Sequence, residues 1–292
     1  MLSLVIPIVL SLVSTAAAGC AANDTLDGRP LGEFRIGALF PMFINAAGAS
    51  AGAIDTGGVQ RMHGFLMALR EINNKTDGIG DNLLPNTTLK LAARDSKRDT
   101  GAAFFGALHL CDRAFGDAGV HVFVGAASSA PSIQGALIST EFRTPQISYS
   151  ATTSDLSSFQ RFPMFMRMPP SDAYQGRAMA HLVQHYGWES VVTVSSGGSY
   201  GLAGIFEFES AARLEGIHIA MRVTFSGTDS GKAIEDTKHR FPAIIKQIYD
   251  SGYRVIVYFG PHIDGCEYNS SCSLSLCSAS RAFNRVWDLL QK

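Results

Sequence analysis

The sequence has few charged residues and no long run of charge of either sign. Of its 292 residues, 17% are charged, and the 24 basic and 25 acidic side chains give a formal net charge of -1. Proteins that neutralise a phosphate backbone carry an excess of Lys and Arg, which this chain lacks. The basic residues are also scattered, so no polybasic patch for a membrane surface is present. Nucleic acid is therefore not an expected partner.

The sequence also lacks the common motifs for metal and phosphate chemistry. It contains no His-Glu-x-x-His motif, no Gly-x-x-x-x-Gly-Lys-[Ser/Thr] loop and no Gly-x-Gly-x-x-Gly fingerprint. No pair of carboxylates suited to glycoside hydrolysis stands out, and the cysteines lack the spacing of a zinc site. The sequence therefore predicts neither a metal nor a cofactor.

Only five cysteines occur, and each has a separate interpretation. Cys20 follows an apolar leader, and Cys111 lies in a helical pattern that is typical of a buried free thiol. Cys266, Cys272 and Cys277 cluster within "CEYNSSCSLSLC". In an oxidising compartment this cluster favours one local disulfide and one remaining thiol, with the pairing left open.

Beyond its N-terminus the chain has no apolar run of transmembrane length. Residues 1–20 form an apolar stretch that ends in small residues, which predicts a signal peptide although Lys and Arg are missing from its start. An uncleaved anchor and a bacterial lipoprotein box at Ala17-Ala18-Gly19-Cys20 are the alternatives. The sequence has four N-glycosylation motifs, at Asn23, Asn74, Asn86 and Asn269. We expect a secreted protein or one on the extracellular face of the plasma membrane.

Apolar segments with the period of strands alternate with segments that have the period of helices. Predicted strands cover residues 34–40, 87–95, 120–126, 145–150, 190–196, 217–225 and 253–260. Predicted helices cover 59–74, 101–115, 131–142, 173–187, 200–216, 243–252 and 280–292. Such alternation predicts an α/β fold with parallel sheets. The two prolines in "FMRMPPSD" (165–172) predict a boundary between lobe one, 33–168, and lobe two, 171–292.

One pentapeptide, Gly197-Gly198-Ser199-Tyr200-Gly201, matches the Gly-x-Ser-x-Gly elbow of serine hydrolases. The flanking patterns supply the strand and the helix that such an elbow needs. The partners are weaker: Asp229 with His239, or Asp229 with His262, and no oxyanion motif is present. A hydrolase that uses Ser199 stays an alternative, beside a plain turn.

Longer motifs resemble the extracellular ligand-binding region of class C G-protein-coupled receptors, closest to the metabotropic glutamate receptors. These are "GGVQRMHGFLMALREIN", "GAASSAPSIQ", "TPQISYSATTSDLSS", "FMRMPPSDAYQGRAMAHLVQHYGW" and "SYGLAGIFEFESAARLEGIHIA". The resemblance covers about 34–258 and implies a bilobed Venus flytrap, like the type I periplasmic binding proteins, whose second lobe is incomplete at Lys292. It also implies a small-molecule ligand, an amino acid such as glutamate, held by lobe closure and not altered.

The resemblance assigns ligand contacts to Arg61, Ser129, Ser150, Thr152, Asp172 and Tyr200. Ser129 and Thr152 would hold the α-carboxylate, and Ser150, Thr152 and Asp172 the ammonium. Arg61 would contact a side-chain carboxylate, and Tyr200 would cover the ligand from lobe two. Each residue also has an ordinary structural interpretation: helix caps for Ser129 and Asp172, turn formers for Ser150 and Thr152, a core tyrosine and a solvated arginine.

The sequence departs from the family in several places. Gly57 stands where those receptors often have a tyrosine, and Lys97 stands where they have a disulfide cysteine. The loop with the intersubunit cysteine is missing, so we expect at most a non-covalent homodimer, through Ile138 and Phe142. A G protein would be reached only through a membrane domain that this sequence does not contain. A secreted, soluble amino-acid-binding protein is the alternative to a receptor.

Overall fold

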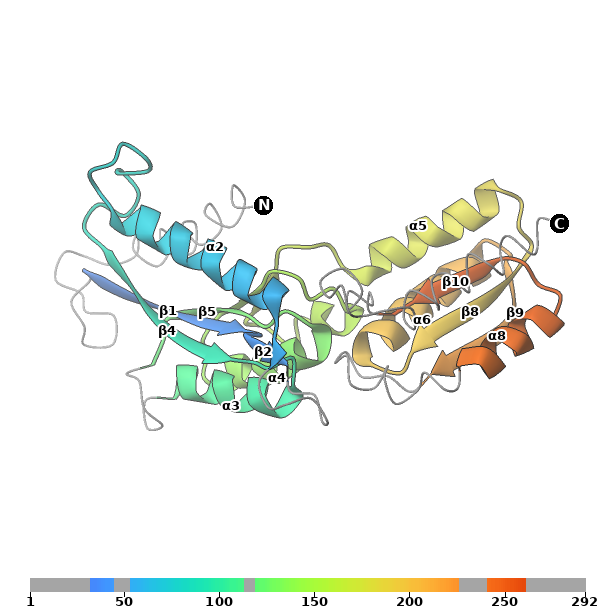
Figure 1. The fold of residues 1–292 in the computed structure, drawn as a ribbon. Helices are drawn as coiled ribbons and strands as arrows, with labels where there is room; N and C mark the ends of the chain where they lie inside the picture. Colours follow the sequence, from blue (N-terminus) through green and yellow to red (C-terminus); the bar gives the residue numbers. More distant parts are fainter. Residues whose placement is uncertain (1–31, 45–52, 113–118, 226–240, 261–292) are drawn as a thin grey trace. The chain divides into compact units, whose positions relative to one another are not determined.

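The computed structural model describes residues 32–44, 53–112, 119–225 and 241–260. The chain divides into two compact units, of which the first ends at Asp172 and the second begins at Ala173. Figure 1 shows the elements of both units, which we describe one at a time. The lobe limits predicted from the sequence stay predictions, because both units include residues outside the described ranges.

A parallel sheet forms the centre of the first unit. Among the described residues its five strands have the order β4 (Thr88–Asp95), β1 (Glu33–Phe40), β5 (Val122–Gly125), β6 (Gln146–Ser148) and β7 (Phe165–Arg167). All four neighbouring pairs are parallel. This arrangement confirms the predicted α/β class. Strand β7 was not predicted, because its three residues were assigned to the boundary segment.

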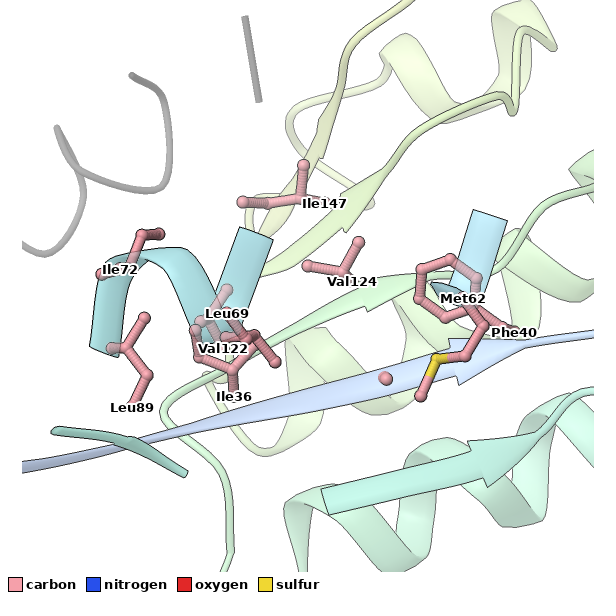
Figure 2. Close-up of a cluster of buried hydrophobic side chains, with 10 residues drawn as sticks. Ile36, Phe40, Met62, Leu69, Ile72, Leu89, Val122, Val124 and Ile147 are labelled. Atoms are coloured by element: carbon pink, nitrogen blue, oxygen red, sulfur yellow. The ribbon is translucent and has the colours of Figure 1, made fainter. Parts of the chain in front are cut away.

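Helices cover both faces of this sheet (Figure 1). Helix α2 (Thr56–Asn73) lies on one face, and α3 (Thr100–Cys111) and α4 (Ser129–Glu141) pack side by side on the other. Figure 2 shows the core under α2, which consists of Ile36, Ala38, Phe40, Met62, Leu69, Ile72, Leu89, Val122, Val124 and Ile147. Residues with strand and helix periodicity thus bury one continuous apolar layer.

A second core lies between the sheet and the pair α3 and α4. It includes Leu39, Leu110, Phe123 and Ile138, and Ile138 is only 7% exposed. The expectation that Ile138 would lie on a dimer face is therefore wrong, because this side chain packs inside its own unit. Phe142 remains 37% exposed at the end of α4.

The loops of the first unit contain two short elements that the sequence patterns did not predict. Strand β2 (Phe43–Ile44) pairs antiparallel with β3 (Ala53–Ile54), and a 3₁₀ turn, η2, covers Ser154–Ser157. Elements of two to four residues are too short to carry a hydrophobic period. The β2–β3 pair leads the chain from the end of β1 to the start of α2.

A second parallel sheet forms the centre of the other unit. Among the described residues it has the order β10 (Ile256–Phe259), β8 (Ser190–Ser196) and β9 (His218–Phe225). Helices α5 (Asp172–His185) and α6 (Ser199–Leu214) pack on one face, and α8 (Phe241–Asp250) on the other. The predicted helix at 280–292 and the three clustered cysteines lie outside the described residues.

Several predictions about processing concern residues that the structure does not describe. The signal peptide, Asn23 and Asn269 all lie outside the described ranges, whereas Asn74 and Asn86 are exposed. Asn74 follows α2, and its amide donates to Asp77 at 2.6 Å. In the described part of the chain, no helix combines the length and the apolar character needed to cross a membrane. Glycosylation stays a prediction.

The close approach of α2 to the loop after β1 gives a stability test. A Cβ atom at Gly58 would lie 1.6 Å from the carbonyl oxygen of Pro41, whereas a Cβ at Gly64 on the same helix meets nothing within 4 Å. We expect Gly58→Ala to destabilise the protein by about 1–3 kcal/mol or more, because the backbone must move. Gly64→Ala should stabilise it by about 1 kcal/mol through helix propensity. Urea unfolding measures the free energy of unfolding of both variants. Equal effects of the two substitutions would contradict the close approach of Gly58 to Pro41.

The thiol of Cys111 gives a second test. Cys111 is a buried free cysteine, and burial raises the pKa of its thiol to about 11, although a hydrogen bond with Thr144 lowers it. The thiolate is the reactive form, so we expect iodoacetamide at about pH 8 to leave Cys111 unmodified in the native chain. Because the folded pKa is raised, the stability from the neutral thiol is complete below its ordinary pKa of 9.0 and is lost as pH rises through about 11.

Peptide mass spectrometry after alkylation reads out Cys111 separately from the other cysteines. The same peptide should become fully modified in urea, which serves as the control. Rapid modification of the folded chain at Cys111 would show that the thiol is not buried.

Candidate functional site

The strand order of the first unit defines one edge at which a ligand is expected. Counted in chain order, the strands run 2-1-3-4-5: the chain passes from β1 to β4 on one side of β1, and it continues from β5 to β6 in the opposite direction across the sheet. Open α/β sheets bind ligands at the carboxyl ends of their strands, where the order reverses. Here that place is the end of β1 at Phe40 and the end of β5 at Gly125.

Serine hydroxyls join the loops that follow β5 and β6. The carbonyl oxygen of Ala126 accepts from the hydroxyls of Ser132, at 3.0 Å, and Ser148, at 2.7 Å. The exposed Ser150 donates its hydroxyl to the carbonyl of Ala127 at 2.5 Å. Ser150 therefore joins its own loop to the loop after β5, and its oxygen keeps lone pairs that can accept from a ligand.

Ser129 lies at the start of α4, on the loop from β5. It is the first residue of the helix and only 3% exposed, whereas the N-cap is Ser128. The alternative interpretation of Ser129 as the helix cap is thus wrong. The positive end of the helix dipole at this end of α4 suits the binding of an anion.

Thr152 and Asp172 are brought together by backbone hydrogen bonds. The carbonyl of Thr152 accepts from the N–H of Asp172 at 2.8 Å and from Arg167 Nη1 at 3.1 Å, and Arg167 Nη1 also donates to Thr153 at 2.7 Å. Asp172 is the first residue of α5 and is 1% exposed. A carboxylate in the first turn of a helix is also favoured by the helix dipole.

Arg167 was missed by the sequence reasoning. It ends β7, the strand that was not predicted, and it is half-buried. Burial lowers the pKa of its guanidinium, and the charge of Asp172 acts in the opposite direction. Arg167 thereby fixes the segment from Thr152 to Asp172, and it also donates to the hydroxyl of Ser157.

Arg61 lies on the exposed side of α2, beside a buried acid. Asp55 is the N-cap of α2, and its Oδ1 accepts from the N–H of Gly58 at 2.9 Å. A Cβ atom added at Gly57 would lie 3.4 Å from Arg61 Nη1 and 3.5 Å from Asp55 Oδ1. The guanidinium of Arg61 and the carboxylate of Asp55 therefore border the space that the missing side chain at position 57 leaves.

Asp55 binds a different arginine, Arg98, which comes from the loop after β4. Arg98 donates from Nε to Asp55 Oδ2 and from Nη2 to Oδ1, the latter at 3.2 Å. Neither residue was identified from the sequence. "DTGG" at 55–58 carries the signal of a helix cap, but nothing local indicates the partner, which is 43 residues away.

Tyr149 lies close enough to Arg61, Asp55 and Arg98 for their charges to affect its pKa. The sequence patterns did not identify this residue either. Its ring stacks on Phe40 with centroids 4.8 Å apart, and its buried hydroxyl has no hydrogen-bond partner among the described residues. Burial raises the pKa of the Tyr149 phenol above its ordinary range; the charges of Arg61 and Arg98 act against this rise, and that of Asp55 adds to it. All three charges thus act on one phenol, which follows β6 and stacks on the last residue of β1.

Tyr200 and Ser199 belong to the second unit. They are the first two residues of α6, after the N-cap Gly198, and Tyr200 is half-buried with its ring 5.3 Å from that of Phe259. This contact matches the structural interpretation of Tyr200 as part of the core. A Cβ at Gly201 would lie 2.1 Å from Ser196 Oγ, so this glycine of the pentapeptide allows close packing of helix on strand.

The strand, turn and helix that the hydrolase alternative needs are present around Ser199. Its candidate partners, Asp229, His239 and His262, lie outside the described residues. Across the described ranges, no group of three or more His, Cys, Asp or Glu side chains could hold a metal ion. The six predicted ligand contacts remain predictions, five of them in the first unit.

Comparison with known proteins identifies the family. A sequence model described as "Receptor family ligand binding region" matches residues 60–268, well over half of the chain. The chain belongs to this family. Residues on both sides of the division between the two units are included in the match, so neither unit alone accounts for it.

Within the receptor ligand-binding family, the chain is similar to metabotropic glutamate receptors. Metabotropic glutamate receptor 4 of Macaca fascicularis is 33% identical over 255 residues, which cover 80% of this chain and 27% of the receptor. The same receptor of Mus musculus is 34% identical with the same coverage. Metabotropic glutamate receptor 6 of Rattus norvegicus is 31% identical over 224 residues, or 70% of this chain and 25% of the receptor.

These similarities confirm the resemblance inferred from the motifs. The chain spans about a quarter of the length of these relatives, which are named as receptors and not as enzymes. The parallel sheets and flanking helices of the structure agree with a fold of the periplasmic-binding-protein type.

The buried hydroxyl of Tyr149 gives a test of this part of the site. An unpartnered buried hydroxyl costs about 1–3 kcal/mol, so we expect Tyr149→Phe to leave stability unchanged or to raise it within that range. Thermal unfolding measures the effect. Tyr149→Leu, which removes the ring that stacks on Phe40, is the control and should destabilise. A large loss of stability in Tyr149→Phe would show that the hydroxyl has a partner.

Proposed function

We propose that the chain is the extracellular ligand-binding region of a class C, metabotropic glutamate-like G-protein-coupled receptor, and that it binds a free amino acid. The observation that carries the proposal is the set of groups at the carboxyl-end loops of the first sheet. Ser129, Ser150 and Thr152 follow β5 and β6 and would supply hydroxyls there, and Asp172 at the start of α5 and Arg61 on α2 would supply one charge of each sign. An α-amino acid needs this combination.

The chemistry of a zwitterion explains the assignment of each group. The α-carboxylate needs donors, which the hydroxyls of Ser129 and Thr152 provide, and the helix dipole at the start of α4 favours a negative charge there. The ammonium needs acceptors, and the carboxylate of Asp172 with the oxygen of Ser150 meets that need. The guanidinium of Arg61 suits a carboxylate on the ligand's side chain, so glutamate is the first candidate.

Binding would proceed by closure of the two lobes, without a covalent step. The ligand docks on the first lobe, and the second lobe then brings Tyr200, whose ring can add a cation–π contact of about 0.5–2 kcal/mol to the ammonium. Tighter binding to the closed form shifts the population toward it. In a full receptor, closure would bias the membrane domain that reaches a G protein.

The setting of the protein follows from the same proposal. The ligand-binding region lies on the extracellular side of the plasma membrane or is secreted, with glycans at its exposed asparagines. The exposed Phe142 at the end of α4 belongs to the face of a non-covalent homodimer. Because the site only binds its ligand, no enzymatic activity is expected, and a fluorophosphonate probe should not label Ser199.

Calorimetric titration of the full chain against the free amino acids tests the proposal. Charged hydrogen bonds contribute about 1.5–3 kcal/mol, so Arg61→Ala should weaken glutamate binding roughly 10- to 150-fold while neutral amino acids are little affected. Arg70→Ala on the same helix is the matched control and should change neither.

Two results would contradict the proposal. Absence of heat with every amino acid would remove the assigned ligand class. An equal loss for glutamate and alanine in Arg61→Ala would show that Arg61 does not read the side chain of the ligand.

A further inference from the structure

The loops that carry Asp55 and Arg98 are held in one frame by backbone groups. The N–H of Asp55 donates to the carbonyl of Met42 at 2.9 Å, and the N–H groups of Met42 and Lys97 both donate to Asp95 Oδ1 at 2.8 Å. The N–H of Ser96 donates to Phe40 at 3.0 Å. The ends of β1 and β4 therefore place the acid and the arginine against each other.

Asp55 is an anion that would compete with the ligand for the guanidinium of Arg61. Its side chain is only 4% exposed, and its Oδ1 borders the same space beside Gly57 as Arg61 Nη1. A buried carboxylate strongly favours a nearby cation, because water does not screen or solvate its charge. Left alone, Asp55 would attract the guanidinium of Arg61, which is the group proposed to hold the ligand.

Arg98 already satisfies both oxygens of Asp55. Its guanidinium donates to Oδ2 and to Oδ1, and Gly58 donates a third hydrogen bond to Oδ1. A fork of this kind matches a carboxylate in both position and charge. Asp55 and Arg98 compensate each other, so the positive charge of Arg61 is not neutralised by this acid.

We propose that Arg98 is a positioning residue that keeps Asp55 from pairing with Arg61 and so leaves Arg61 available to the side-chain anion of the ligand. This inference rests on the proposed function for the ligand, but the pairing itself can be tested without one. Tyr149 faces the same three charges and is neutral, so it does not change the balance.

Glutamate titration of charge variants gives the first test. Arg98→Gln frees Asp55 to bind Arg61, and we expect glutamate affinity to fall at least tenfold. Asp55→Asn keeps the helix cap, because asparagine caps as well as aspartate, and it should bind glutamate like the unchanged chain. Combined with Arg98→Gln, it should restore the affinity. A double variant as weak as Arg98→Gln would overturn the proposal, since Arg98 would then act on the ligand directly.

A stability cycle between Asp55→Asn and Arg61→Gln gives the second test and needs no ligand. With Arg98 intact, we expect Asp55→Asn and Arg61→Gln to change the unfolding constant independently. The effect of the double variant should then equal the product of the two single effects to within twofold. With Arg98→Gln, we expect a coupling above fivefold, because the new pair forms. Absence of coupling in that background would overturn the proposal. If Asp55 and Arg61 couple in that background but the unchanged chain binds no glutamate, the pairing inference holds and the proposed function is wrong.

Matched controls and a milder variant keep the result interpretable. Asp99 caps α3 in the same way, with Oδ1 accepting from Ala102 at 2.8 Å, and Asp99→Asn should not restore affinity to Arg98→Gln. Arg70→Gln should show no coupling to Asp55. If Arg98→Gln does not fold, Arg98→Lys keeps the charge without the fork. It should lose part of the affinity, and Asp55→Asn should again restore it; no loss in Arg98→Lys would count against the fork.

Discussion

Parallel pairing of β1 with both β4 and β5 is the constraint on which the candidate site depends. It brings the carboxyl ends of β1, β4 and β5 to one edge of the sheet, where the loops after these strands begin. Hydrogen bonds then fix those loops to one another: two serine hydroxyls share the carbonyl of Ala126, and the acid Asp95 holds the loops after β1 and β4. The polar groups proposed to bind the ligand are therefore carried by a rigid frame.

The two buried acids of this region, Asp55 and Asp172, each have an arginine nearby, whereas the serine hydroxyls bond to backbone carbonyls. Asp55 is bound by Arg98, and Asp172 lies near enough to Arg167 to affect its pKa. An unpaired charge would be costly in these partly buried positions, and a neutral hydroxyl can both donate and accept without that cost. Neutral hydroxyls together with a few charged side chains suit the proposed zwitterionic ligand, because each of its two charges can be held by several uncharged hydrogen-bond partners.

Membership in the receptor ligand-binding family fixes the general class of the protein, and the structure shows which residues of this chain surround Arg61. Gly57 leaves space beside Arg61, and Arg98 places a second cation near that space. The relatives' names include glutamate, but the arrangement of Asp55, Arg98 and Tyr149 is a property of this chain's own residues.

The sequence by itself determined the alternation of strands and helices, the parallel sheets and the position of Ser129, Ser150 and Thr152 at strand ends, because these depend on local hydrophobic periods. Its longer motifs also indicated the family. Local patterns could not reveal β7, with its three residues, or the burial of Ile138 between two helices. Only the tertiary structure paired Asp55 with Arg98 across 43 residues and set both beside Arg61 and Tyr149, because such contacts are made by the meeting of separate loops at the end of a sheet.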